Sequence, residues 1–163
     1  MFTKGLFDTE RLRIRTFRRK DFERFLDIAL DKEVQKYFKG LGRSVSEISE
    51  YFDLIMSQDR QYNEALAITL RTTHQIIGYI GAFSMPPETL NVEYFLAKEF
   101  RECRYGTEAF EGLISYIRIF YPHIRYISLM LDKKNIASQE LLSNFGPEIR
   151  DFDTKNYEYI ISL

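Results

Sequence analysis

The feature that most constrains this chain is a strand, a short turn and a helix that follow one another between residues 92 and 120. The run 92–96 is apolar and has the length of a strand. The helix after the turn has one apolar face, formed by Phe110, Leu113, Ile114 and Ile117. At the start of such a helix the backbone N–H groups lack partners and the helix dipole is positive. We therefore expect an anion, such as a phosphate group, to bind at residues 101–107.

Strand and helix patterns continue along the rest of the chain. Apolar runs predict further strands at 11–17, 65–70, 75–83, 126–131, 148–152 and 157–163. Helices are predicted to begin at Asp21, at Ser44, which has capping-box spacing with Glu47, and at Asn135. Two glycines predict a mobile loop at 39–43. This order predicts an α/β fold: a mixed, mostly antiparallel sheet with a central parallel crossover and helices on both faces.

Length and composition favour a single domain over residues 1–163. The net charge is −1, so no overall field favours nucleic acid as a partner. The chain has one cysteine, Cys103, and two histidines, so neither an internal disulfide nor a metal site is predicted. No apolar run approaches the roughly 20 residues of a membrane span. These features predict a cytoplasmic protein without a membrane partner.

Three segments together carry a resemblance to a known family. Residues 9–15 read T-E-R-L-R-I-R, residues 101–109 read R-E-C-R-Y-G-T-E-A, and residues 135–146 combine N-x-x-S with two leucines and a glycine. In this order and on these elements, they resemble the GNAT superfamily of acetyl-CoA-dependent N-acetyltransferases. The chain is most similar to the branch that includes ribosomal-protein N-terminal acetyltransferases, whose coenzyme loop commonly reads R-G-K-G-Y-A-T-E-A.

This resemblance implies a GNAT-like acyl-CoA N-acyltransferase fold, with acetyl-CoA as cosubstrate and no metal. It implies that backbone groups of Phe95, Leu96 and Ala97 bind the pantetheine arm and polarise the thioester carbonyl. Asn135 and Ser138 would face the thioester, and Ser138, or a water that it holds, would protonate the leaving thiolate. The pyrophosphate would be held by the amides of the loop, which are those of Arg101, Glu102, Cys103, Arg104, Tyr105, Gly106 and Thr107.

The chain departs from the family pattern at three positions. Arg104 occupies a glycine position of the coenzyme loop, where a non-glycine residue at positive φ costs roughly 1–2 kcal/mol. Leu142 stands where many GNAT enzymes have a tyrosine that serves as acid. Asn91 stands where the strand before the loop often begins with glutamate, and Glu93 lies two residues further on. Glu93 joins Ser138 and Asn135 as a catalytic candidate, while its role as general base stays open.

The implied reaction is acetyl transfer to a primary amine, by direct attack in a ternary complex. Only the free base attacks, and at pH 7 it makes up roughly 10% of an α-amine but less than about 0.1% of a lysine-type amine. That difference corresponds to about 3 kcal/mol. Because no base is obvious in the sequence, a peptide or protein N-terminus is favoured as acceptor, and a small-molecule amine stays possible.

Each assignment has an alternative. The chain would be a non-catalytic acyl-CoA-binding module if Arg104 and Leu142 abolish turnover, or an RNA-binding scaffold if the basic residues of 11–20 contact phosphates. Independently of these alternatives, Asn135 would only cap its helix and Glu93 would point to solvent, while Cys103 is interpreted as a spectator thiol and not as a nucleophile. The oligomeric state is either a monomer or a homodimer.

Overall fold

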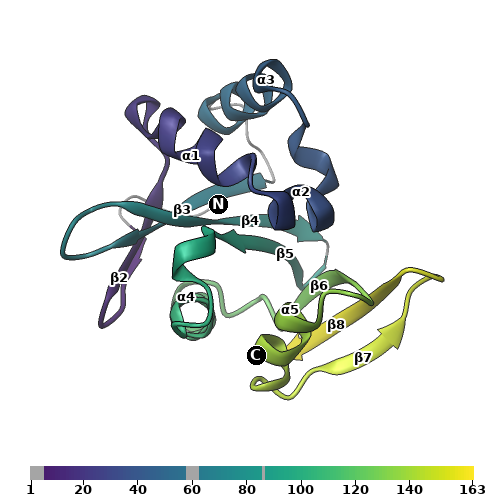
Figure 1. Ribbon diagram of the computed structural model, residues 1–163. Coiled ribbons are helices and arrows are strands. Elements are labelled where there is room, and N and C mark those ends of the chain that lie inside the picture. Colours follow the sequence, from purple (N-terminus) through teal and green to yellow (C-terminus); the bar gives the residue numbers. More distant parts are fainter. Residues whose placement is uncertain (1–5, 58–62, 86) are drawn as a thin grey trace.

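The computed structural model describes residues 6–57, 63–85 and 87–163. In this part of the chain the strands form one sheet in the order β1-β2-β3-β4-β5-β6-β8-β7 (Figure 1). The strands are β1 (Phe7–Asp8), β2 (Leu12–Thr16), β3 (Asn63–Leu70), β4 (Ile76–Met85), β5 (Thr89–Leu96), β6 (Tyr126–Asp132), β7 (Glu148–Asp151) and β8 (Asn156–Ser162). The α-helices are α1 (Phe22–Ala29), α2 (Lys32–Tyr37), α3 (Val45–Met56), α4 (Tyr105–Phe120) and α5 (Ile136–Ser143). Three 3-10 turns are η1 (Arg19–Asp21), η2 (Lys39–Leu41) and η3 (Lys98–Phe100).

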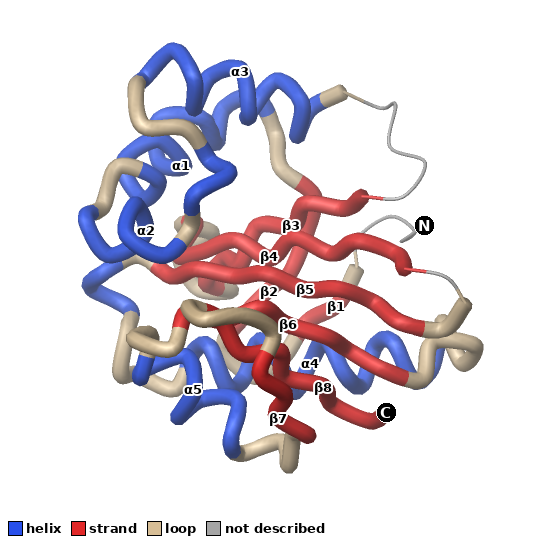
Figure 2. Tube along the Cα trace, turned by 90° about the vertical axis from the view of Figure 1, so that its right-hand side faces the viewer, coloured by secondary structure: helices blue, strands red, loops and turns tan. Residues whose placement is uncertain are grey.

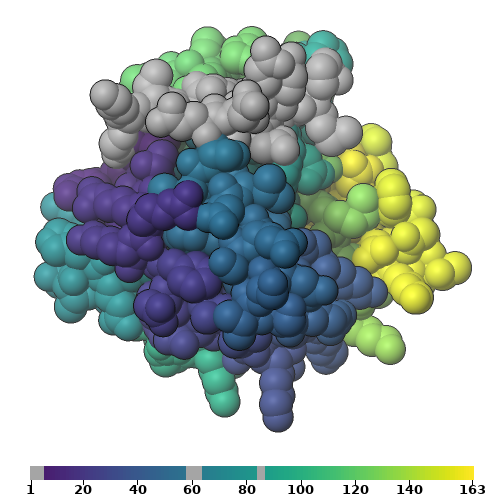
Figure 3. Space-filling model, turned by 90° about the horizontal axis from the view of Figure 1, so that it is seen from above, coloured from purple at the N-terminus to yellow at the C-terminus, as the bar shows by residue number. Residues whose placement is uncertain are grey.

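Helices cover both faces of the sheet. Helices α1, α2 and α3 lie on one face, and α4 and α5 lie on the other (Figures 1 and 2). Figure 3 looks down on this layer, where the purple and blue atoms of α1 to α3 fill the middle of the view and the yellow atoms of the C-terminal segment lie to one side. The expected mixed sheet with helices on both faces is confirmed. Within the described residues, no helix is both long and apolar enough to cross a membrane.

A separate hydrophobic core fills each face. One core joins β5 to α4 through residues such as Val92, Leu96 and Phe110, and the other joins it to α1 and α3 through Phe95. Since successive side chains of a strand point to opposite faces, Glu93 shares the α1–α3 face with Phe95, and Tyr94 shares the α4 face. This alternation places two polar neighbours on opposite sides of the sheet.

The sheet has one parallel pair, and that pair is short. β5 and β6 pair only from Thr89 opposite Tyr126 to Asn91 opposite Ser128. Beyond this point β5 continues against β4 and β6 continues against β8, so the two strands separate. The expected parallel crossover through the helix after residue 101 is confirmed, and it leaves a gap between the carboxyl ends of β5 and β6.

Several local expectations need correction. The loop predicted at 39–43 contains η2, whose Leu41 is buried, and its mobility stays a prediction. Asp21 does not cap α1 with its side chain. Its carboxylate instead accepts from the Arg18 amide and pairs with Arg15 at 2.7 Å in a buried ion pair. The capping box of Ser44 and Glu47 is confirmed.

Candidate active site

A cleft of about 130 Å³ occupies the gap between β5 and β6. Residues 37–40, from α2 and η2, form one wall, and Glu93 and Tyr94 of β5 form another. The end of β6 and the start of α5, with Asn135 and Ser138, complete it. The strand geometry therefore brings together all three residues that the sequence singles out as catalytic candidates.

Among the titratable side chains that line the cleft, Glu93 has a pKa that is shifted close to neutral pH. Burial raises the pKa of Glu93 to about 7, although a hydrogen bond from Tyr79 acts in the opposite direction. The Tyr79 hydroxyl donates to Glu93 Oε1 at 3.1 Å. A carboxyl group with this pKa is present in both forms near neutral pH, as a general base requires. The alternative in which Glu93 points to solvent is wrong, because the side chain is partly buried in the cleft wall.

Gly81 of β4 makes room for this carboxyl group. It lies directly opposite Glu93 in the β4–β5 register. A Cβ atom at residue 81 would lie 2.5 Å from the Tyr79 hydroxyl oxygen and 2.8 Å from Glu93 Oε1. Real Cβ atoms do not approach other atoms so closely, so a side chain here would force Tyr79 or Glu93 to move.

Tyr94 and Ser138 meet on the opposite side of the cleft. Both line the cleft, and burial raises the pKa of Tyr94 to about 12 although the Ser138 hydroxyl acts in the opposite direction, so the Tyr94 hydroxyl stays protonated. Asn135 Oδ1 accepts from the Ser138 amide at 3.2 Å, which caps α5. The capping role of Asn135 is therefore present in the structure, and Asn135 also lines the cleft.

Leu142 cannot replace the tyrosine that many relatives have at its position. Its side chain is completely buried in the core between α4, α5 and the sheet. Among the residues that line the cleft, Ser138 and Tyr94 carry hydroxyl groups on the α5 side.

The loop before α4 presents free amides. Helix α4 begins after Arg104, which has no side-chain capping bond, and its first backbone bond runs from the Glu108 amide to the Arg104 carbonyl. Within the described residues, the amides of Tyr105, Gly106 and Thr107 have no acceptor. Three free amides at the positive end of a helix dipole suit a phosphate group.

Two residues of this loop have left-handed backbone conformations. Glu102 has φ 63° and Arg104 has φ 61°. The left-handed region is unfavourable for any residue with a Cβ atom, as Glu102 and Arg104 both have. The loop therefore holds two non-glycine residues in a conformation that favours glycine, and contacts from other segments hold it in place.

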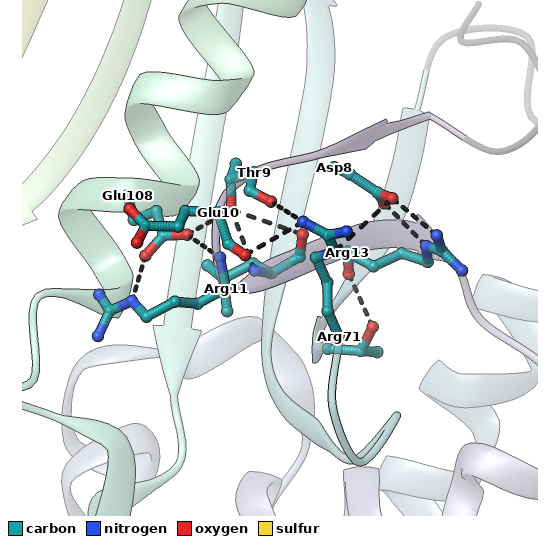
Figure 4. A network of polar contacts seen from close by, with 9 residues as sticks. Asp8, Thr9, Glu10, Arg11, Arg13, Arg71 and Glu108 are labelled. Carbon is teal, nitrogen blue, oxygen red and sulfur yellow. Dashed lines mark hydrogen bonds and ion pairs between the residues drawn. The ribbon is translucent and has the colours of Figure 1, made fainter.

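One set of contacts comes from the N-terminal segment. Glu108 accepts from the Thr9 hydroxyl at 2.5 Å and from the Arg11 amide at 2.7 Å, and it pairs with Arg11 Nε at 2.6 Å (Figure 4). Arg11 also donates to the Cys103 carbonyl at 3.2 Å and lies 4.1 Å from the centre of the Tyr105 ring. The first and second sequence segments of the resemblance are thus in direct contact.

A second contact fixes the other end of the loop. Arg101 donates to the Leu96 carbonyl at 3.1 Å and to Asp31 at 2.6 Å. Its own amide donates to Lys98. The side chain of Arg101 therefore ties the loop to β5 and α2, and its amide is already paired.

The peptide groups of β5 differ in their availability. Ala97 donates to Ile77 at 2.8 Å and accepts from Phe100, so both its groups are paired. The backbone N–H and C=O groups of successive strand residues point in alternate directions. The backbone groups of Phe95 therefore also face β4, while those of Tyr94 and Leu96 face the gap. Of the three residues expected to bind the pantetheine arm through their backbone, only Leu96 turns its amide toward the cleft.

Tyr79, Tyr94 and Asp31 belong to the site but were not singled out in the sequence. Tyr94 adjoins Glu93, so strand alternation alone places it across the sheet. Tyr79 reaches Glu93 because it stands two residues before Gly81 on the paired strand, which only the register reveals. Among the described residues, no cluster of three or more His, Cys, Asp or Glu side chains is suited to a metal ion.

A larger hollow of about 820 Å³ runs along the outer side of α4, lined by residues 6–11 and by Arg104 and Phe120 among others. It does not include Glu93, Asn135 or Ser138. The smaller cleft is the one that holds Glu93, Asn135 and Ser138, the three catalytic candidates from the sequence.

Comparisons with known proteins agree with this geometry. A family model described as an acetyltransferase (GNAT) domain matches residues 11–148. No curated protein is a significant match. A GNAT-family acetyltransferase from Bacillus anthracis is 16% identical, with a TM-score of 0.79 over 96% of each chain.

Two further solved structures share the fold. RimL, a ribosomal-protein α-N acetyltransferase, is 13% identical with a TM-score of 0.81, over 97% of this chain and 93% of that one. Spermidine N-acetyltransferase from Vibrio cholerae, solved with CoA and spermine, is 12% identical with a TM-score of 0.77, over 93% of this chain and 95% of that one. At these identities the likeness concerns the fold.

Proposed function

Because the chain belongs to the GNAT acetyltransferase family, we propose that it transfers an acetyl group from acetyl-CoA to an α-amine at a peptide or protein N-terminus. The amine attacks the thioester directly, while both substrates are bound. The observation that carries this proposal is the Glu93 carboxyl group in the cleft, with a pKa of about 7.

With Glu93 as the base, α-amines are easier to deprotonate than lysine-type amines, because their ammonium groups are more acidic. An α-ammonium group has a pKa of about 8, so proton transfer to Glu93 is uphill by about one unit, or about 1.4 kcal/mol. A lysine-type ammonium group, with a pKa of about 10.4, requires more than about 4 kcal/mol for the same transfer. The sequence leaves the role of Glu93 as general base open, and with Glu93 as the proposed base the same acceptor is favoured.

Acetyl-CoA would lie through the gap in the sheet. The amides of Tyr105, Gly106 and Thr107 hold the pyrophosphate, and the outward amide of Leu96 hydrogen-bonds the pantetheine arm or the thioester carbonyl. Ser138 and Tyr94 lie on the α5 side, opposite Glu93 across the sheet. The amine therefore loses its proton on one side while hydroxyls stabilise the leaving thiolate on the other.

The solved structures that share this fold include enzymes associated with amine acceptors of more than one kind. RimL is described as an α-N-protein acetyltransferase, and the Vibrio cholerae enzyme was solved with spermine. The pKa argument selects the first kind of acceptor for this chain, since the amines of spermine resemble lysine in basicity.

The proposal is tested by measuring thiol release from saturating acetyl-CoA with a panel of amines at pH 7. The panel contains a free-N-terminal peptide without lysine, the same peptide with a blocked N-terminus and one lysine, and spermine. We expect turnover with the first peptide to be at least tenfold faster than with the other two. Failure to acetylate any amine would reject the enzymatic function.

A non-catalytic coenzyme-binding module is the second candidate. The buried Leu142 and the left-handed Glu102 and Arg104 favour it, because they remove the usual acid and strain the loop. Calorimetric titration with acetyl-CoA distinguishes the two. Tight binding without thiol release for any amine identifies the module, whereas binding with release identifies the enzyme.

A further inference from the structure

A chain of three hydroxyl and carboxyl groups crosses three elements behind the cleft. Tyr51 of α3 and Tyr79 of β4 lie with their hydroxyl oxygens 2.8 Å apart. Tyr79 then donates to Glu93 Oε1 of β5 at 3.1 Å. Within the described residues, α3 does not line the cleft. The hydrogen bonds therefore link α3 to the cleft indirectly, through Tyr79.

Counting protons sets the direction of the bonds. A tyrosine hydroxyl has one proton to donate and can accept from another donor. Since Tyr79 donates its proton to the Glu93 carboxylate, Tyr51 must be the donor in the bond between the two tyrosines. Because Tyr51 donates to the Tyr79 oxygen, the Tyr79 proton stays directed at the Glu93 carboxylate, and the Tyr79 O–H bond is polarised.

Packing holds Tyr79 in place. The residue is 1% exposed, and its ring stacks on Phe95 with centres 4.9 Å apart and planes at 13°. Phe38 meets the same ring edge-on at 5.8 Å. The Tyr51 ring is stacked parallel to Phe25 at 6.4 Å. Neither hydroxyl can leave the chain without disturbing an aromatic cluster, so the Glu93 carboxylate meets a donor in a fixed position.

We infer that Tyr79 is a positioning residue for Glu93 and that Tyr51 orients the Tyr79 hydroxyl, so that α3 sets the geometry of the general base from outside the cleft. This inference rests on the proposed function, in which Glu93 is the base. It extends that function to two residues on elements that do not touch the substrates.

The electrostatics of the cleft agree with this assignment. Burial raises the pKa of Glu93, and the Tyr79 hydrogen bond limits the rise. Burial also raises the pKa of Tyr79 well above its usual value, so Tyr79 stays a neutral donor. The other titratable side chains of the cleft wall are Tyr37, Lys39, Tyr94 and Asp132. Among the described residues, Tyr79 is the side chain that hydrogen-bonds the Glu93 carboxyl group.

The test is a carbon-13 NMR titration of the Glu93 carboxyl group, with the signal assigned by its loss in Glu93→Gln. The variants are Tyr79→Phe and Tyr51→Phe, which keep the stacked rings, and Tyr126→Phe serves as a control outside the chain. Gly81→Ala provides a second route to separate Tyr79 from Glu93 if Tyr79→Phe does not fold.

We expect Tyr79→Phe and Gly81→Ala to raise the midpoint by about one unit, as loss of a hydrogen bond to a charged group does. Turnover at pH 7 should fall about tenfold, mainly in kcat. Tyr51→Phe should raise the midpoint by less, and Tyr126→Phe should leave it in place.

The direction in which Tyr51→Phe shifts the Glu93 titration midpoint decides the role of Tyr51. A downward shift would show that Tyr51 competes for the Tyr79 proton and would overturn its assigned role. An unchanged midpoint in Tyr79→Phe would overturn the inference as a whole and leave the proposed function standing. If the Glu93→Gln variant turned over as fast as the wild type, Glu93 would be rejected as the base, whatever the titrations show.

Discussion

At the scale of single residues, the site depends on side chains in unusual surroundings. Glu93 is a carboxyl group that burial keeps partly protonated near neutral pH. Glu102 and Arg104 have backbone conformations that glycine adopts at lower cost. Such departures from ordinary residue behaviour concentrate at functional sites, where the surrounding structure sustains them.

The pH dependence of activity tests Glu93 directly. We expect the ratio of kcat/KM between the wild type and Glu93→Gln to rise with pH through about 7 and then level at roughly 100-fold. Taking the ratio cancels the titration of the amine, which both proteins share. The measurement is initial-rate kinetics from pH 5.5 to 9, and a ratio that is flat across this range would contradict the role of base.

The same residue predicts a dependence of stability on pH. Because its pKa is raised in the folded protein, the native state binds more protons than the unfolded state between about pH 4.5 and 7. Stability therefore falls as pH rises through this window, by up to about 3 kcal/mol. Urea unfolding at pH 5 and pH 8 measures the free energy of unfolding of both proteins. Relative to the wild type, Glu93→Gln should be more stable at pH 8 than at pH 5. An equal difference at both pH values would mean that burial does not perturb Glu93.

The left-handed residues predict a stabilising substitution. Arg104→Gly should increase the free energy of unfolding by about 0.5–1 kcal/mol, since relief of roughly 1–2 kcal/mol of strain exceeds the entropic cost of glycine. Arg104→Ala is the matched control, because it removes the same side chain but keeps Cβ. Chemical denaturation measures both, and equal stability of the two variants would contradict strain at this position.

At the scale of elements, sequence patterns predicted the strands and long helices well, because α4 and the strands have clear apolar periodicity. They missed α2, whose six residues are too few for a periodic pattern, although Asp31 caps it through the Glu33 and Val34 amides. The buried pair of Asp21 with Arg15 was not predictable either, because it depends on how β2 meets η1.

The start of α5 separates a structural role from a chemical one. Asn135→Ala should reduce stability by about 1 kcal/mol, through loss of the cap to the Ser138 amide. Ser138→Ala should leave stability nearly unchanged but lower kcat more than coenzyme affinity. Thermal unfolding, kinetics and calorimetry on the two single variants check this division. Equal losses of stability and turnover in both would assign the pair to capping alone.

At the scale of the whole molecule, the gap between β5 and β6 organises the site. The sequence predicted the parallel pair and which candidates lie near it, because motif order and the crossover determine both. It did not predict that Ala97 is already paired, or that Tyr79 reaches Glu93, because both depend on the β4–β5 register. The single domain over residues 1–163 and the cytoplasmic location stay predictions.

The basic residues near the N-terminus also acquire a structural explanation. Arg11 pairs with Glu108, Arg13 with Asp8, and Arg15 with Asp21. These pairs tie β2 to α4, β1 and η1. They give this strand a role in holding the loop before α4, with three basic residues of 11–20 in ion pairs.

The most direct test is a competition within one peptide that has a free N-terminus and one internal lysine. The protein, the peptide and acetyl-CoA are incubated at pH 7, and tandem mass spectrometry locates the acetyl group. Acetylation at the α-amine in large excess over lysine is the predicted result, because the α-ammonium group gives up its proton to Glu93 more readily. Acetylation mainly at lysine, or at neither amine, would contradict it.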